Sequence, residues 1–217
     1  MNSKESGNTP IQGYTFSLNP LPAVKSGYLK MSLLEGFLQN LSKYSDMYAR
    51  LDHDPALTHH LYLVGKQVRN CERAWTKIDL IDIIRWRRLH PLARRITLSA
   101  SELERLLNEA LTRNDGDDRV EALCEIRGFG PVLASAILTL TWPDKYGFLT
   151  YHSWTALWVL GFDVSEKGFS GGGFTVPECS RFLRIIRQLA NQAAASPALT
   201  ADALYVFDSM RRKHRWA

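Results

Sequence analysis

The sequence predicts an all-α protein, a helical domain of two lobes, and two observations support this prediction. Along most of the chain, apolar residues recur at spacings of three and four, as they do in helices that face a core. No segment alternates apolar and polar residues as a half-exposed strand does, and no internal repeat is present. With 217 residues, of which 45% are apolar and 23% charged, the chain can bury one large core or two small lobes.

The helical domain is expected over 29–217, after an N-terminal arm. Residues 1–28 are rich in Ser, Asn, Gly and Pro, a composition that predicts an extended or flexible arm. The arm lacks the apolar segment of a secretory signal, so the expected location is the cytoplasm. No apolar run reaches the roughly eighteen residues of a membrane span, so no membrane partner is expected. The sequence does not indicate an oligomeric state.

Helix boundaries in the first half of the chain follow from apolar spacing and capping residues. One helical stripe runs over 31–48, and a second helix is predicted over 54–74. Thr76 to Asp79 has the pattern of a capping box, and Ser99 is expected to cap the next helix. The pair Asp118 and Glu121 predicts the cap of the helix that enters the central stretch of the chain.

The second half is predicted to be helical on both sides of a glycine-rich linker. Gly161 is the expected C-cap of a helix that begins near Ser153. The glycines within 166–174 predict a linker between lobes, and the segment lacks the Gly-Lys-Ser/Thr sequence of a nucleotide-binding loop. Apolar residues at helical spacing over 182–190 and 204–210 predict two closing helices, and a basic end follows them.

The central stretch, 123–138, predicts two helices joined by a tight turn. Glycine suits such a turn because it has no Cβ, and proline suits a first helical turn because it has no N–H to leave unpaired. Backbone N–H groups at the start of the second helix then form an anion site, and on nucleic acid that anion is a phosphate. The residues expected to contact DNA are therefore Arg127, Gly128, Phe129, Gly130 and Pro131.

These residues resemble the helix-hairpin-helix motif, and the segment that follows them, 142–154, is similar to the DNA glycosylase superfamily built on that hairpin. The resemblance covers residues 120–160. It implies a base-excision repair type of protein, in which a hairpin lobe of about 76–162 faces a second lobe formed by about 29–75 and 175–217. It also implies a DNA partner and a nucleotide extruded from the duplex.

The catalytic residues of that superfamily are not matched in this sequence. Val132 occupies the position of the Schiff-base lysine, and Thr150 occupies the position of the aspartate, so neither an amine nor a carboxylate is supplied. Thr150, Tyr151 and His152 are expected to line the cleft as a polar pocket for an extruded base, with Asp144 as a nearby acid. The alternative is that Thr150 and His152 cap a helix and satisfy buried carbonyls, and that Asp144 is a turn residue.

No metal or iron–sulfur site is expected from the cysteines and histidines. Cys71, Cys124 and Cys179 are too few and too widely spaced for a four-cysteine cluster, and all three are predicted to be buried and reduced. The metal-binding arrays His-x-x-x-His, His-x-Glu and Cys-x-x-Cys are absent. A monovalent cation at the hairpin carbonyls is implied only by the resemblance.

The charge balance favours a polyanionic partner. The net charge is +5, and Arg85, Arg87 and Arg88 flank Trp86 as a possible phosphate track, although arginines at a helix C-terminus also favour the helix dipole. The sequence therefore predicts a DNA-binding protein that excises or recognises a damaged or modified base. The alternatives are a non-catalytic helix-hairpin-helix DNA-binding module and a helical protein-interaction domain.

Overall fold

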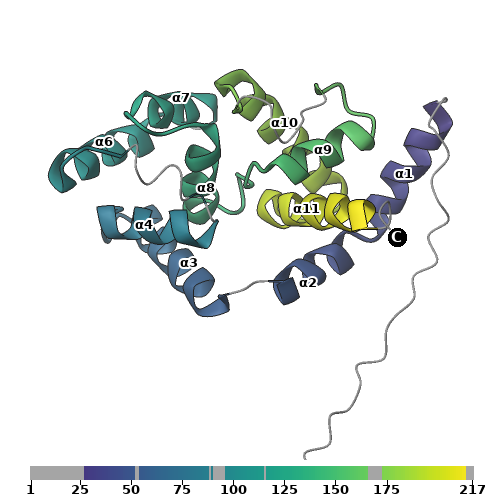
Figure 1. Ribbon diagram of the computed structural model, residues 1–217, viewed down its shortest axis with the longest axis horizontal. Coiled ribbons are helices and arrows are strands. Elements are labelled where there is room, and N and C mark those ends of the chain that lie inside the picture. Colours follow the sequence, from purple (N-terminus) through teal and green to yellow (C-terminus); the bar gives the residue numbers. More distant parts are fainter. Residues whose placement is uncertain are drawn as a thin grey trace, which may run out of the picture.

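The computed structural model describes residues 27–51, 54–87, 89, 96–114, 116–165 and 173–213, and within them all regular structure is helical (Figure 1). The all-α prediction is confirmed. The described helices, in chain order, are α1 (Gly27–Gln39), α2 (Leu41–Leu51), α3 (Pro55–Arg69), α4 (Lys77–Trp86), α6 (Ala100–Thr112), α7 (Asp117–Glu125), α8 (Pro131–Thr141), α9 (Tyr151–Val159), α10 (Val176–Gln192) and α11 (Pro197–Lys213).

Several helix ends lie where side-chain caps predict them. Thr76 and Asp79 form a reciprocal capping box at α4, and the Ser99 hydroxyl accepts from Glu102 N at 3.3 Å at the start of α6. Gly161 follows α9 with φ of 93°, as expected after a helix C-terminus. The predicted Asp118 cap is wrong. Helix α7 begins at Asp117, and its N-cap residue is Gly116, which has φ of 95° and no side chain that could cap the helix.

Two helix boundaries differ from the predicted ones. The stripe over 31–48 is two helices, and Asn40 separates them, with its Nδ2 donating to Gly36 O at 2.8 Å. Helix α3 ends at Arg69 rather than near residue 74, because Cys71 takes a left-handed φ of 59°. Cys71 is therefore exposed, which corrects its predicted burial, whereas Cys124 is half-buried and Cys179 is buried.

Helix α8 lies at the centre of the fold. Every residue from Leu133 to Thr141 is buried, and the hydroxyls of this segment are satisfied inside the helix, as when Thr139 donates to Ser135 O at 2.7 Å. Thr141 also accepts from the indole Nε1 of the fully buried Trp75 at 3.1 Å. A helix buried on all sides needs apolar residues around its whole circumference, and α8 has them.

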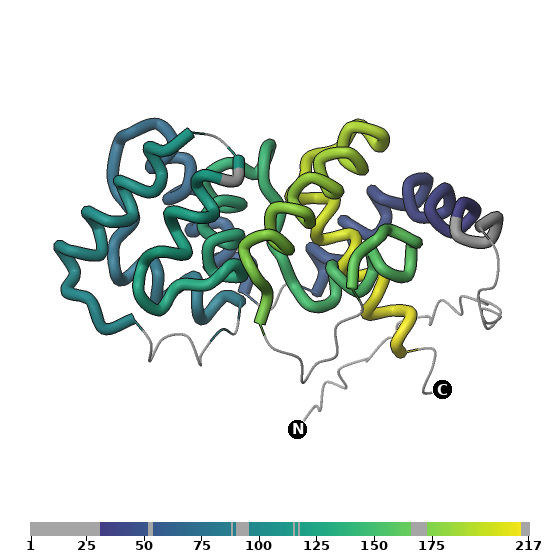
Figure 2. Tube along the Cα trace, turned by 90° about the horizontal axis from the view of Figure 1, so that it is seen from above, coloured from purple at the N-terminus to yellow at the C-terminus, as the bar shows by residue number. Residues whose placement is uncertain are grey.

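The other helices surround α8 in two neighbouring groups (Figures 1 and 2). Helices α3 and α4 pack on α8, and α6 packs on α4 and α7, while α11 packs on α2, α9 and α10. Helix α10 contacts α7, α8 and α11 and so belongs to both groups, and buried side chains from nearly all of these helices form one continuous core. Helix α3, predicted in the second lobe, packs on α8, and α9, predicted in the hairpin lobe, packs on α11. The two-lobed division and its boundaries stay a prediction.

None of the helices in the described part of the chain combines the length and the hydropathy of a membrane-spanning segment.

Candidate functional site

The predicted hairpin is a tight connection between α7 and α8. Gly128 has φ of 93°, in the left-handed region that favours glycine, and Phe129 N donates to Ile126 O at 2.9 Å to close the turn. Gly130 is extended, with φ of −143°, so its conformation does not require glycine. Its lack of a side chain matters for space, because a Cβ built there has no heavy atom within 4 Å. The turn is therefore open at Gly130.

The N-terminus of α8 has no side-chain cap. Gly130 is the N-cap residue and Pro131 is the first helical residue, and the cap makes no side-chain hydrogen bond. Val132 and Leu133 follow, and N–H groups at these positions have no carbonyl partner within a helix. Arg127 is exposed beside them, while Phe129 is half-buried against the core. The turn thus carries an exposed cation and an uncapped helix N-terminus, and the Phe129 ring anchors it to the core.

Thr150 caps α9 rather than lining a cleft with an available hydroxyl. Its Oγ1 accepts from Ser153 N at 2.9 Å, and Thr150 N donates to Ser153 Oγ at 2.9 Å. These two bonds form a complete capping box. The alternative of a helix cap for Thr150 is confirmed, and this residue offers no group that replaces a catalytic carboxylate.

His152 pairs with a buried carboxylate that the sequence did not identify. His152 Nδ1 lies 2.8 Å from Asp208 Oδ2, and Asp208 is fully buried. Arg211 Nη2 lies 2.8 Å from Asp208 Oδ1, and Arg212 Nε lies 2.6 Å from Oδ2. The Arg212 guanidinium also lies 5.0 Å from the ring centre of Tyr151. The start of α9 is therefore tied to the end of α11 by a network of charges.

The ionisation of Asp208 follows from these partners. Burial alone raises the pKa of a carboxyl group, but hydrogen bonds from His152, Arg211 and Arg212 outweigh it and hold the pKa of Asp208 below its ordinary value. Asp208 is thus a carboxylate at neutral pH, and its oxygens are hydrogen-bonded to three side chains. The spacing of Asp208 from Arg211 and Arg212, three and four residues along α11, is the sequence signal that points to it.

Asp144 lies apart from this network. Its Oδ1 pairs with Arg69 Nη1 at 3.0 Å, and about half of its side chain is exposed. Asp144 follows the C-terminal end of α8, whereas Thr150, Tyr151 and His152 stand together at the start of α9. Of the four predicted cleft residues, Thr150, Tyr151 and His152 lie together, whereas Asp144 lies away from them and pairs with Arg69.

The predicted phosphate track is not a continuous exposed row. The Arg85 side chain is 67% exposed and pairs with Asp82 at 3.5 Å, and Arg88 lies outside the described residues. The Arg87 side chain is only 9% exposed, because its guanidinium carbon lies 3.5 Å from the centre of the Trp86 ring and 4.3 Å from that of Phe148. Arg87 therefore does not form an exposed row with Arg85.

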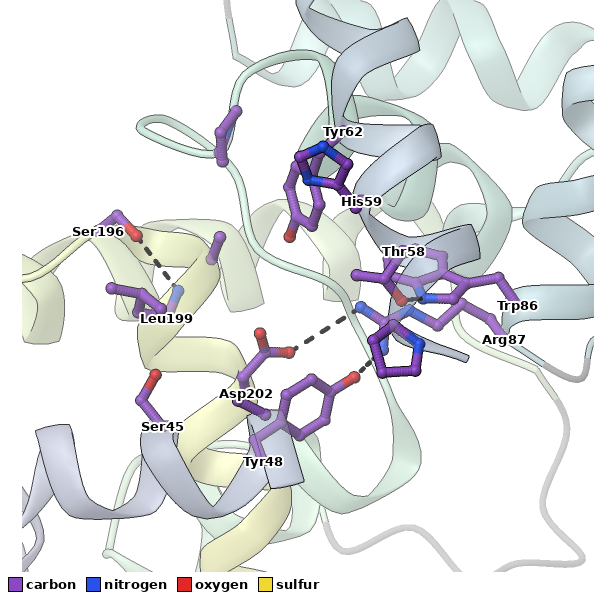
Figure 3. Close-up of a pocket in the computed structure, with 14 residues that line it drawn as sticks. Ser45, Tyr48, Thr58, His59, Tyr62, Trp86, Arg87, Ser196, Leu199 and Asp202 are labelled. Atoms are coloured by element: carbon purple, nitrogen blue, oxygen red, sulfur yellow. Dashed lines mark hydrogen bonds and ion pairs between the residues drawn. The ribbon is translucent and has the colours of Figure 1, made fainter. Parts of the chain in front are cut away.

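Arg87 points into a pocket of about 570 Å³ between α2, α3, the end of α4 and the start of α11 (Figure 3). Its walls carry aromatic rings, hydroxyls and one pair of opposite charges, among them Tyr48, Thr58, Tyr62, Trp86, Arg87 and Asp202. These residues come from four separate segments of the chain, so no local pattern in the sequence identifies the pocket.

The described residues contain no group of three or more His, Cys, Asp or Glu side chains placed to hold a metal ion. At the hairpin, the Ile126 carbonyl already accepts from Phe129 N, and the monovalent cation implied there stays a prediction. Compared with models of known protein families, with curated proteins and with solved structures, the chain gives no match in any of the three comparisons.

Proposed function

We propose that this protein binds DNA through the turn between α7 and α8, with a phosphate held against the first turn of α8. One observation carries the proposal: the N-terminus of α8 has no side-chain cap, and the Gly130 position beside it opens onto free space. Helix N-terminal amides and the helix dipole favour an anion at such a place. The exposed Arg127 adds a positive charge next to it.

The proposed ligand is DNA because the same residues carry the resemblance to the helix-hairpin-helix glycosylases, whose hairpin contacts the duplex backbone. The net charge of +5 agrees with a polyanionic partner. Since phosphate contacts fix register without reading bases, this site alone gives binding of low sequence preference. Recognition of a damaged or modified base belongs to the same proposal and needs further contacts outside the turn.

We favour a binding module over an excising enzyme. Val132 and Thr150 supply neither an amine nor a carboxylate, and the Thr150 hydroxyl is occupied as a helix cap. The carboxylate of Asp208 is held by three basic side chains. Incubation with a panel of lesion-bearing duplexes tests this preference directly: we expect binding without base release, and release of any base would restore the excision alternative.

The variant Gly130→Glu tests the binding site itself. The open space at Gly130 admits the new side chain, so the fold should persist, while a carboxylate at the helix N-terminus should exclude phosphate and abolish DNA binding. Gly173→Glu is the matched control, because it adds the same charge at an exposed glycine that also has open space at the Cβ position. Fluorescence anisotropy with a labelled duplex measures binding, and circular dichroism verifies the helices.

Undiminished binding by a folded Gly130→Glu protein would show that the hairpin is only a structural turn. If the unaltered protein shows no salt-dependent binding to duplex or single-stranded DNA, the helical protein-interaction domain becomes the better account.

A further inference from the structure

The pocket around Arg87 is separate from the proposed DNA site. Pro143, which follows the C-terminal end of α8, lines the pocket, whereas the hairpin turn precedes the N-terminal end of the same helix. Helix α8 has eleven residues, so its two ends are about 16 Å apart at 1.5 Å per residue. The pocket and the hairpin therefore share no lining residue.

The guanidinium of Arg87 is fixed but incompletely paired. Its position over the Trp86 and Phe148 rings restricts it, and its Nη1 donates to the Tyr48 hydroxyl (Figure 3). Within the described residues its Nε has no hydrogen-bond acceptor. Burial lowers the pKa of Arg87 to about 10, with Asp202 and Tyr205 opposing that shift, so Arg87 is still a cation at neutral pH. A buried guanidinium has five donors, and few of them are used here.

Asp202 faces Arg87 across the pocket from α11. Its Oδ1 lies 3.9 Å from Arg87 Nη2, which is too far for a hydrogen bond. The separation is short enough for two adjacent atoms of one ligand to reach both groups. The ligand atom facing Arg87 must accept, and the atom facing Asp202 must donate. The fixed charges of the lining are those of Arg87 and Asp202, and His59 is the other ionisable side chain there. A ligand anion would meet Asp202 and a ligand cation would meet Arg87, so the complementary ligand is neutral.

The remaining walls are mainly aromatic and apolar. Tyr62 and Trp86 meet edge to face at 6.4 Å, and the Trp86 indole N–H is fixed by donation to Thr58 Oγ1 at 2.6 Å. Leu199 contributes an apolar side on α11. The volume of about 570 Å³ falls within the range of small-molecule sites and accommodates a heterocyclic base with an attached sugar.

We propose that this pocket binds guanine, presented either as a free nucleoside or as an unpaired base of a single-stranded nucleic acid. The carbonyl oxygen of guanine accepts a hydrogen bond from Arg87. The ring N–H next to that carbonyl and the exocyclic amino group of guanine both donate to the Asp202 carboxylate. Adenine offers the carboxylate a single amino donor and has no carbonyl, so it fits less well. Methylation of the guanine ring N–H removes the central donor and adds bulk at the contact.

Isothermal titration with guanosine tests the pocket, with adenosine and 1-methylguanosine as comparison ligands. We expect guanosine to bind about ten-fold or more tightly than either. Asp202→Asn should weaken guanosine binding at least about ten-fold, since the amide cannot accept both donors. Leu199→Trp should also weaken it by filling the pocket, and this half-exposed position tolerates a larger side chain without loss of fold. The control is Asp82→Asn, because Asp82 pairs with Arg85 and neither residue lines the pocket.

Two further arms identify the source of the base. A single-stranded oligonucleotide with one guanine is compared with the same sequence carrying adenine, using the Gly130→Glu protein to remove hairpin contacts. A preference for guanine in the oligonucleotide but no binding of the nucleoside would assign the pocket to nucleic acid, and binding of both would assign it to the base itself. Absence of binding in both arms, or affinities unchanged by Asp202→Asn and Leu199→Trp, would overturn the proposal.

Discussion

The α-carbon of Gly65 in α3 faces the backbone of Leu140 in α8, so that a Cβ at residue 65 would lie 2.0 Å from the Leu140 carbonyl oxygen. The two helices approach each other more closely than any side chain at this position permits. The neighbour is backbone and not the flexible end of a side chain, so it cannot move aside without shifting α8. The position of α8, and of the hairpin that precedes it, depends on this contact.

Gly65→Ala should therefore destabilise the protein by about 3 kcal/mol or more, because relief of the clash must separate two buried helices. Gly36→Ala is the matched control: it lies within α1, has open space at the Cβ position, and should raise stability by about 0.5 to 1 kcal/mol through helix propensity. Urea unfolding followed by circular dichroism gives both free energies. Equal stability of the two variants would contradict the close approach of α3 and α8.

Arg127→Ala should weaken DNA binding by roughly 1 kcal/mol and reduce the slope of log affinity against log salt by about one unit, as expected for one lost phosphate contact. Arg50→Ala removes an exposed arginine from α2, which packs on α1 and α11 rather than on α7 and α8. It should leave the slope unchanged. Anisotropy titrations between about 50 and 200 mM salt measure both slopes. Identical slopes for the two variants would remove Arg127 from the interface.

Asp208→Asn should lower the free energy of unfolding at neutral pH by about 3 kcal/mol, since it breaks a buried charge network and leaves two arginines without their carboxylate. The pKa of Asp208 is held low in the folded protein, so its contribution is present above the unfolded pKa of about 4 and is lost as pH falls through the lower folded value. The difference between variant and unaltered protein should therefore shrink below about pH 4.

Urea unfolding at several pH values measures this dependence. Asp163→Asn serves as the control, because Asp163 pairs with Arg181 while its own side chain is fully exposed, and its replacement should have no measurable effect. A stability difference for Asp208→Asn that stays constant from pH 7 to pH 3 would show that the carboxylate charge is not what stabilises the network.

The three thiols should react in a fixed order with iodoacetamide near pH 8. Cys71 is exposed and should react first, whereas burial, aided by the charge of Glu121, raises the pKa of Cys124 to about 11 and leaves little thiolate. Cys179 is buried and should react only after unfolding. Mass spectrometry of timed digests assigns each site, and Cys71→Ser should remove the fast phase alone. Rapid labelling of Cys179 in the folded protein would contradict its burial on the core side of α10.

Local signals in the sequence were sufficient for much of the fold. Thr76 with Asp79, Ser99 and Gly161 act on groups within a few residues of themselves, so their roles are readable from spacing. The left-handed turn at Gly128 is local in the same sense. The apolar spacing predicted the wrong end for α3. The helix ends at Arg69, so Cys71 lies beyond it and is exposed.

The candidate sites depend on partners that spacing does not reveal. His152 meets Asp208 fifty-six positions later in the chain, and Arg87 meets Tyr48 and Asp202 from two other helices. In the sequence, Arg87 stands beside Trp86 and other arginines, a pattern that predicts a row of exposed arginines. Only the packing of Phe148 against Trp86 and Arg87 shows that this one faces inward. Tertiary contacts, rather than composition, decide which charges are available to a ligand.

The contact of Cys179 with the hairpin has a consequence for how the hairpin acquires its fold. Cys179 Sγ in α10 reaches the Pro131 carbonyl at 3.8 Å, and α10 packs on both α7 and α8. During synthesis, the two helices of the hairpin thus emerge well before the surface that supports them. A fragment limited to residues 120–160 would contain every residue of the recognisable pattern and still lack its folding partner. The length of chain that must be inherited together to keep this hairpin folded is therefore much longer than the motif itself.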